Sequence, residues 1–228
     1  MEELNFNVAG RQVTRMAVVK GVLGRFIQAR DGDRIGIVVF GSQSFVLSPM
    51  TLDIHAAYSL LDSIVARMAG DGTAIGDAIG MALKRLSHSE GETVLVLLTD
   101  GANTAGNVAP DKAAELAAQA GLRIHSIGVG GVPRAVRGLL GMQMINPAAD
   151  LDENTLQNIA KTTGGQYFRA TDRQALEAIY QRLDELEPVT QGSRVVRPTT
   201  ELYVWPLGLA FGLSLGLALS AWRRGAAR

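Results

Sequence analysis

Two oxygen-bearing side chains, Thr73 and Asp100, stand where they could bind a divalent cation together. Asp100 ends an apolar run at residues 93–99 and is followed by Gly101, while Thr73 closes the loop that begins at Gly70 and precedes an amphipathic stretch. Mg²⁺ takes oxygen ligands in a near-octahedral arrangement and keeps some of its waters, so a hydroxyl and a carboxylate could contribute to such a site. Each residue also has a simpler explanation, Thr73 as a helix N-cap and Asp100 as the start of a turn.

The elements that must position these side chains alternate along the chain. The apolar run at 93–99 predicts a strand buried on both faces, which is typical of a parallel sheet. Further strands are predicted at 34–40, 44–48 (an edge strand), 122–129 and 166–170, and helices at 11–30, 53–68, 73–86, 110–119, 152–163 and 172–186. Residues 1–10 and 130–150 show no period and are expected to be irregular. This alternation predicts a doubly wound α/β domain, whose ligands bind at the carboxyl ends of the strands, where Asp100 is expected.

The composition narrows the possible functions. The 228 residues include 22 basic and 22 acidic side chains, so the charge balance gives no reason to expect a nucleic-acid partner. The chain has no cysteine, which excludes disulfides, zinc–thiolate sites and thiol nucleophiles.

The C-terminal segment 202–222 carries no charge and predicts a transmembrane helix. At about 1.5 Å per residue it is long enough for a hydrocarbon core of about 30 Å. Tyr203 and Trp205 at one end and Trp222 at the other are placed as interfacial anchors. A buried core helix is the competing interpretation. Small residues recur every four positions and could form a helix-packing stripe: Gly208, Gly212, Gly216 and Ser220.

The predicted organisation is therefore a domain at 1–186, a linker at 187–201, a membrane helix at 202–222 and a basic tail at 223–228. Arginines are more numerous after the helix than before it, which favours a cytoplasmic C-terminus and a periplasmic domain. If Met1 is the true start, the alternative is a tail-anchored chain with a cytoplasmic domain.

Two short motifs resemble the von Willebrand factor A (VWA) fold and its metal-ion-dependent adhesion site (MIDAS). Residues 70–73 (GDGT) match the threonine loop of that site, and residues 98–101 (LTDG) match its final aspartate. The resemblance extends over residues 1 to about 186 and, with the C-terminal helix, narrows to the bacterial membrane-bound aerotolerance group (BatA/BatB-like). It implies a protein-interaction module and not an enzyme, at the bacterial inner membrane, with Mg²⁺ or another divalent cation on Thr73 and Asp100. The implied partners are other membrane or periplasmic proteins, related VWA proteins and a MoxR-type AAA+ ATPase. Together with that ATPase, the chain would act in stress tolerance or in the assembly of envelope complexes.

The first part of the family's metal motif, Asp-x-Ser-x-Ser, is absent from this sequence. Residues 1–3 (MEE) resemble the residues that come directly after that motif, so the resemblance implies an N-terminally truncated chain. The strand before the motif lies in the family between the strands expected here at 34–40 and 93–99. Without it we expect an unstable chain and a Mg²⁺ site no tighter than about millimolar.

Other residues support weaker hypotheses. A nucleotide-dependent hydrolase on the same fold is one alternative, although Gly128–Gly131 lack phosphate-loop spacing. A purely structural membrane subunit that assembles through the glycine stripe is the other. The histidines His55, His88 and His125 are scattered, and Asp77 is explained by the helix dipole.

Overall fold

The computed structural model describes residues 6–8, 11–86, 92–131, 134–138, 141–145, 148–188 and 204–225. The chain divides into two compact units, Met1–Gln191 and Gly192–Arg228, and each is described by itself. The finer boundaries expected at 186, 201 and 222 stay predictions.

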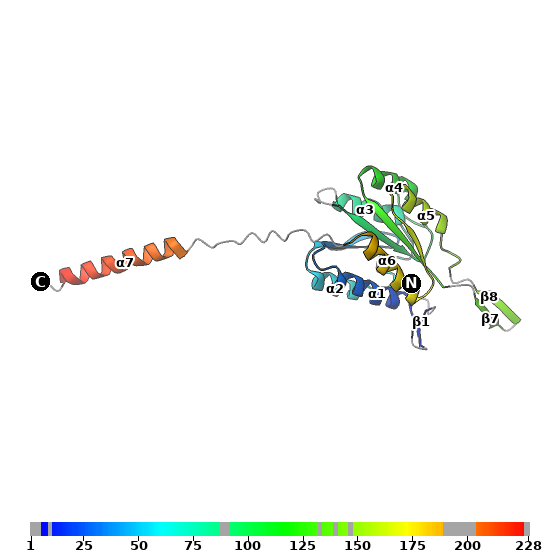
Figure 1. Ribbon diagram of the computed structural model, residues 1–228, viewed down its shortest axis with the longest axis horizontal. Coiled ribbons are helices and arrows are strands. Elements are labelled where there is room, and N and C mark those ends of the chain that lie inside the picture. The colour runs from blue at the N-terminus through cyan, green and yellow to red at the C-terminus, as the bar shows by residue number, and fades with distance from the viewer. Residues whose placement is uncertain are drawn as a thin grey trace. The chain divides into compact units, whose positions relative to one another are not determined.

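The first unit has helices on both sides of its strands. Helices α1 (Arg15–Ala29), α2 (Ile54–Ser63) and α6 (Arg173–Leu186) lie on one side, and α3 (Ile75–Leu86), α4 (Pro110–Gln119) and α5 (Glu153–Thr162) lie on the other (Figure 1). The predicted α/β class is therefore confirmed.

The strands form two separate sheets between these helical layers. Strands β5 (Val94–Thr99), β6 (Arg123–Val129) and β9 (Tyr167–Ala170) pair in parallel, with Leu98 opposite Ile127. Strands β3 (Ile35–Phe40) and β4 (Ser44–Thr51) form an antiparallel pair. Within the described ranges no ladder joins β3 to β5.

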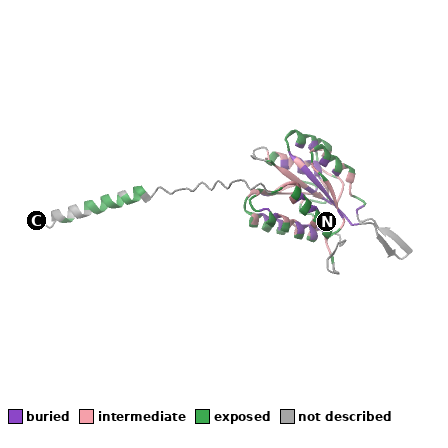
Figure 2. Ribbon diagram, viewed as in Figure 1, coloured by how far each residue is buried: buried purple, intermediate pink, exposed green. Residues whose placement is uncertain are grey.

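The hydrophobic core follows these layers. One cluster joins α1 and α6 to one face of the parallel strands through Val22, Ile127 and Leu183. A second joins α3, α4 and α5 to the opposite face through Ile79, Ile124 and Leu156. Figure 2 shows that the buried residues lie in the strands and on the inner sides of the helices. Both faces of the parallel sheet are covered, as its apolar strands require.

Several predicted elements need correction. The helix expected from residue 11 begins at Arg15, because Thr14 caps it by accepting a hydrogen bond from Ala17 N–H (3.2 Å). The residues before it form a hairpin of β1 (Phe6–Val8) and β2 (Arg11–Val13), which aperiodic polar residues did not indicate. A second hairpin, β7 (Arg134–Gly138) and β8 (Gly141–Ile145), lies in the segment expected to be irregular.

The predicted ends of one helix and one strand are also wrong. Helix α2 ends at Ser63 instead of residue 68, and the chain then turns through Arg67, whose φ is +62°. Strand β4 continues past residue 48 through Pro49, which an edge strand tolerates because the missing N–H can face away from the ladder.

The second unit contains helix α7 (Val204–Gly225), which covers nearly all of the predicted membrane segment. Of the residues described, none form a helix that combines the length and apolarity required for membrane crossing, so this prediction is not supported. The described apolar side chains of α7, such as Trp205 and Phe211, are exposed within this unit.

Candidate functional site

Thr73 and Asp100 lie at the same edge of the first unit, as predicted. Both line one cavity of about 1140 Å³, which the carboxyl ends of β3 and β5 share with the start of α1. The Thr73 hydroxyl also approaches the turn after Asp100, because a Cβ added to Gly101 would lie 3.7 Å from Thr73 Oγ1. We call this edge, made by the loops 41–43, 70–74 and 100–109, the rim.

Asp100 has a cationic neighbour that sequence reasoning missed. Arg15 Nη1 donates a hydrogen bond to Asp100 Oδ2 at 3.1 Å, and the side chains of Arg15 and Asp100 are 4% and 21% exposed. The carboxylate predicted to face a metal ion therefore already faces a buried guanidinium. A signal was present in the sequence, because Arg15 falls in helical phase with Val18, Val19 and Val22 on the buried side of α1.

The backbone of Thr73 is fixed by the loop that follows β5. Its N–H donates to Thr104 Oγ1 (3.0 Å), and its carbonyl accepts from the N–H groups of Thr104 (2.9 Å) and Ala105 (3.2 Å). The first N–H of α3, that of Ile75, donates to Asn103 Oδ1 at 2.8 Å. The capping role that the sequence offered to Thr73 is thus filled from the neighbouring loop by Asn103.

Asp77, in the first turn of α3, also connects this helix to the loop that follows β5. Its carboxylate accepts hydrogen bonds from the backbone N–H groups of Asn107 (3.0 and 3.1 Å) and Val108 (2.9 Å). The helix dipole alone, which the sequence suggested as its role, is therefore an incomplete explanation.

The threonine loop is also held from the side of β3. Ser42 Oγ accepts from Gly72 N–H at 2.8 Å, and Ala74 N–H donates to the carbonyl of Gly41 at 2.8 Å. Gly70 has a φ of +94°, and a Cβ at this position would lie 2.7 Å from Ser42 Oγ, so only glycine fits here. The rim loops thus bridge the two sheets even though β3 and β5 do not pair.

This arrangement agrees with the comparison with known families. The model of the von Willebrand factor type A domain matches residues 2–182. The chain belongs to the VWA family. Its α/β fold, its threonine loop and its aspartate after β5 all lie within the matched range.

Individual relatives place this VWA chain near the BatB-like proteins, as predicted. The crystal structure of BatB from Bacteroides thetaiotaomicron is 27% identical with a TM-score of 0.62, covering 81% of this chain and 94% of that one. An aerotolerance-related membrane protein from Bacteroides fragilis is 26% identical with a TM-score of 0.61, covering 80% and 94%. An uncharacterised protein of Borreliella burgdorferi is 28% identical over 206 residues, 88% of this chain and 60% of that protein. The chain spans about half to three-fifths of the curated relatives that it matches.

A more distant VWA structure shares the fold alone. Proximal thread matrix protein 1 from the mussel byssus, solved with a zinc-occupied MIDAS motif, is 20% identical with a TM-score of 0.59, covering 75% of this chain and 40% of that one.

The two side chains predicted as metal ligands in this VWA domain do not by themselves fit a divalent cation. The two predicted ligands are the hydroxyl of Thr73 and the carboxylate of Asp100, which is already paired with Arg15 at 3.1 Å. Across the described part of the chain, no three His, Cys, Asp or Glu side chains gather closely enough to hold a metal ion. Near-octahedral coordination needs more oxygen ligands than these two. The assignment of Thr73 and Asp100 as metal ligands stays a prediction.

Three further carboxylates line the same cavity and were not singled out from the sequence as ligands. Asp71, in the threonine loop, is exposed and pairs with Arg67 Nε at 3.4 Å, and Asp150 and Asp152 precede α5. Asp152 caps α5, and the hydrogen bonds donated by the hydroxyl and N–H of Thr155 lower the pKa of its carboxyl. Its role is therefore structural, in keeping with an N-cap aspartate.

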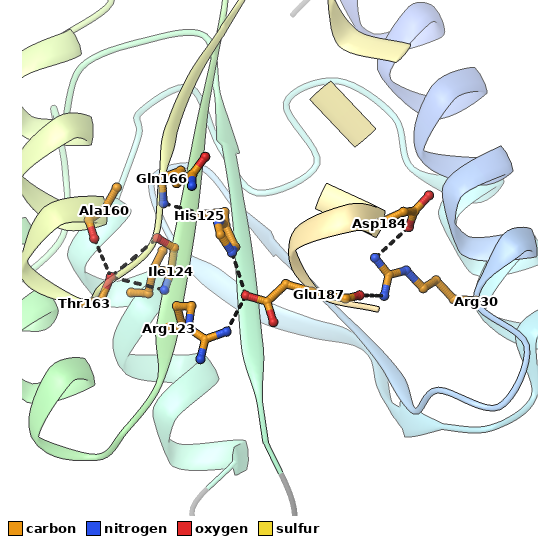
Figure 3. A network of polar contacts seen from close by, with 9 residues as sticks. All are labelled: Arg30, Arg123, Ile124, His125, Ala160, Thr163, Gln166, Asp184 and Glu187. Atoms are coloured by element: carbon orange, nitrogen blue, oxygen red, sulfur yellow. Dashed lines mark hydrogen bonds and ion pairs between the residues drawn. The ribbon is translucent and has the colours of Figure 1, made fainter. Parts of the chain in front are cut away.

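The histidines lie away from the rim. His55 is exposed on α2, and His88 lies outside the described residues. His125 is 2% exposed near the amino end of β6, opposite the rim. Its Nδ1 accepts from Gln166 N–H at 3.1 Å, so its proton is on Nε2, which donates to Glu187 Oε1 at 3.0 Å (Figure 3).

Glu187 connects that end of β6 to two helices. Arg123 also donates to its carboxylate, and Arg30, at the end of α1, donates to its backbone carbonyl (2.6 Å) and contacts Asp184 Oδ1 (2.6 Å). Burial acts to raise the pKa of the Glu187 carboxyl, but the hydrogen bonds from Arg123 and His125 outweigh it and lower that pKa. We call these five residues (Arg30, Arg123, His125, Asp184 and Glu187) the base network (Figure 3).

Proposed function

We propose that this VWA chain is a membrane-associated interaction module and not an enzyme, and that it binds partner proteins at the rim. The observation that carries the proposal is the shared cavity of about 1140 Å³, where Thr73 and Asp100 meet. Carboxyl ends of parallel strands are where α/β sheets bind ligands. A hydroxyl, a carboxylate and exposed backbone loops suit recognition of a polar protein surface.

The proposal that the bound ion is Mg²⁺ rests on the resemblance to the MIDAS-bearing family. The zinc-occupied motif of the mussel protein supports divalent cations for the fold in general. Because Thr73 and Asp100 do not fit such an ion by themselves, the proposed interaction does not depend on one.

The membrane setting is supported by the relatives. BatB and the aerotolerance-related membrane protein are similar to this chain over four-fifths of its length. We extend this to the bacterial inner membrane, with the domain in the periplasm and a MoxR-type AAA+ ATPase or related VWA proteins among its partners. The exposed apolar side chains of α7 support contact with lipid or with other membrane helices.

The test is cross-linking in intact inner membranes followed by purification of the tagged full chain. Thr73→Val and Asp100→Asn should each reduce recovery of a cross-linked partner at least fivefold. Asp111→Asn, an exposed aspartate at the start of α4, is the matched control and should leave recovery unchanged. Unchanged recovery from both rim variants would contradict the proposal, provided that both unfold cooperatively.

A further variant tests the alternative that the chain is a structural subunit that assembles through α7. Gly212 lies on the small-residue stripe of α7, and a Cβ added there meets nothing within 4 Å in the described chain. If Gly212→Leu abolishes partner recovery while the rim variants do not, assembly through α7 replaces the rim as the explanation.

A further inference from the structure

The base network contains a buried histidine, His125, whose two ring nitrogens are both used (Figure 3). Nδ1 accepts a hydrogen bond from the backbone N–H of Gln166 at 3.1 Å, and Nε2 lies 3.0 Å from Glu187 Oε1. A neutral imidazole has one donor and one acceptor nitrogen, and these two contacts use one of each. The site is therefore built for the neutral ring with its proton on Nε2.

A second proton on His125 has no acceptor among the contacts described. It would have to bind at Nδ1, the nitrogen to which the N–H of Gln166 already donates. Two N–H donors cannot share that contact, and a buried donor without an acceptor is unfavourable. Uptake of the proton therefore requires His125 and Gln166 to separate.

The turn 163–166, which joins α5 to β9, is in close contact with the amino end of β6. The Gln166 carbonyl accepts from Ser126 N–H at 3.0 Å, and Thr163 Oγ1 accepts from Ile124 N–H at 3.1 Å. A Cβ added to Gly165 would lie 2.0 Å from the carbonyl oxygen of Ile124. Because the turn has no room to shift toward β6, separation at Nδ1 means movement of the turn away from the strand.

The charged groups that face the ring come from β6 itself and from α1 and α6, which cover this side of the sheet. The Glu187 carboxylate accepts from the ring and from Arg123, and its hydrogen bond, with a smaller contribution from Glu92, raises the pKa of the Arg123 guanidinium. Arg30 of α1 pairs with Asp184 of α6. One carboxylate therefore contacts the ring directly, and it lies on the Nε2 side.

The described neighbours of His125 in the adjacent strands are uncharged. Val96 of β5 is opposite His125 in the parallel ladder, and the Phe168 ring of β9 lies 6.3 Å away between ring centroids. A charged His125 ring would thus be attracted by Glu187 at one nitrogen and would face a backbone donor at the other.

We infer that the base network is an acid-sensitive latch, which holds the turn 163–166 on β6 only while His125 is neutral. Uptake of a second proton breaks the contact with Gln166 and releases the start of β9. The contact with Glu187 persists, because a carboxylate binds a charged donor more strongly than a neutral one. Histidine is the side chain that ordinarily changes charge between pH 5 and 8, so mild acid is the expected trigger.

The inference goes beyond the proposed function. The latch lies at the opposite end of β6 from the rim and would stand if the rim variants had no effect.

The experiment measures hydrogen exchange of the Gln166 amide by NMR, in the full chain in detergent, between pH 7.5 and pH 5.0. Rates are corrected for the intrinsic pH dependence of amide exchange. The closed form holds a neutral ring, and the open form takes up a proton as an exposed histidine does, with an ordinary pKa of about 6.5. By linkage, the open fraction and the corrected rate should rise about thirtyfold as the pH falls over this range.

Two histidine variants localise the effect. His125→Gln keeps a side-chain acceptor for Gln166 and a donor for Glu187 but does not titrate, so its corrected rate should change less than threefold. His55→Gln, at an exposed histidine of α2, is the matched control and should keep the full rise. If His125→Gln does not fold, the unmodified chain decides the question. Its His125 ring nitrogens, observed by NMR, should titrate with the same midpoint as the exchange of Gln166.

Five results would overturn the inference. These are a Gln166 rate that does not rise with acid, an equal rise in His125→Gln, a proton on Nδ1 at pH 7.5, and different midpoints for the ring and the amide. The fifth is an equal rise at amides throughout β5 and β6, which would show that acid unfolds the whole domain.

Discussion

Strands β5 and β6 are neighbours in one sheet, yet the strand with the more apolar sequence is the less buried of the two. β5 (VLVLLT) is the more apolar strand, but only Leu97 and Thr99 of its six residues are buried. β6 (RIHSIGV) contains a histidine and a serine, and every residue after Arg123 is buried. Among the described strands, β6 pairs on both sides, with β5 and β9, whereas β5 pairs only with β6. A strand's burial is therefore set by its neighbours as much as by its own side chains.

The polar residues of β6 are tolerated because each has a partner. Ser126 Oγ donates to the carbonyl of Leu156 at 2.7 Å, and both ring nitrogens of His125 are hydrogen-bonded. Buried polar groups that are satisfied in this way cost little stability. The polar side chains of β6 are therefore compatible with its position between β5 and β9.

The largest effect on the free energy of unfolding is expected from Ile127→Ala, and Leu98→Ala is the variant with which it is compared. These residues are opposite each other in the parallel ladder and contact the same cluster, but Ile127 is fully buried and Leu98 is half-buried. We expect Ile127→Ala to lower the free energy of unfolding by about 2–5 kcal/mol. Leu98→Ala should lower it by only about 1–2 kcal/mol, because water already contacts part of that side chain. Urea unfolding of the full chain in detergent measures both, and equal losses would contradict the comparison.

An intermediate effect is expected from Glu187→Gln in the base network. Loss of charge weakens hydrogen bonds from Arg123 and His125, which should lower the free energy of unfolding at pH 7 by about 1–3 kcal/mol. The folded chain holds the pKa of Glu187 below its ordinary value of 4.5, so its contribution is complete above that pH. The contribution is lost as the pH falls through the folded-state pKa.

Urea unfolding from pH 7 down to pH 3 measures this dependence. The difference between the unmodified chain and Glu187→Gln should shrink with acid. Glu185→Gln, at an exposed residue of the same helix that pairs only with Arg182 among the contacts described, serves as the control. A difference that does not change with pH would show that the carboxylate charge plays no part.

The smallest effect is expected from Mg²⁺ at the rim. With a dissociation constant no tighter than about 1 mM, 1 mM Mg²⁺ should raise the free energy of unfolding by no more than about 0.4 kcal/mol. Unfolding in 1 mM MgCl₂ and in 1 mM EDTA measures this, with Asp100→Asn as the control. A stabilisation of about 2 kcal/mol that Asp100→Asn removes would show that the rim holds the ion despite Arg15.

The sequence predicted those features that local patterns determine. Helical spacing of apolar residues located the helices from α3 to α6 within one or two residues, and the apolar runs located β3, β5 and β6. The position of Thr73 and Asp100 at one rim followed from the rule that parallel strands end at the same edge.

The features that were missed depend on contacts between distant residues. Arg15 and Asp100 are 85 positions apart, and Asn103 caps a helix 28 residues before it in the chain. The partial exposure of β5 depends on how the rest of the chain packs around it, which no property of residues 93–99 could indicate. The hairpin β7–β8 lies in a glycine-containing stretch whose apolar residues do not alternate strictly.

The hydrogen bonds between the two rim loops have one more consequence. Thr73, Ile75 and Asp77 are each bonded to the segment 103–108, so the threonine loop, the start of α3 and the loop after β5 are already ordered as one preorganised body. A protein that docks on this body loses little conformational entropy from the loops, and more of the contact energy remains as affinity. Selectivity among competing partners would then be expressed mainly in how long each complex lives rather than in how fast it forms.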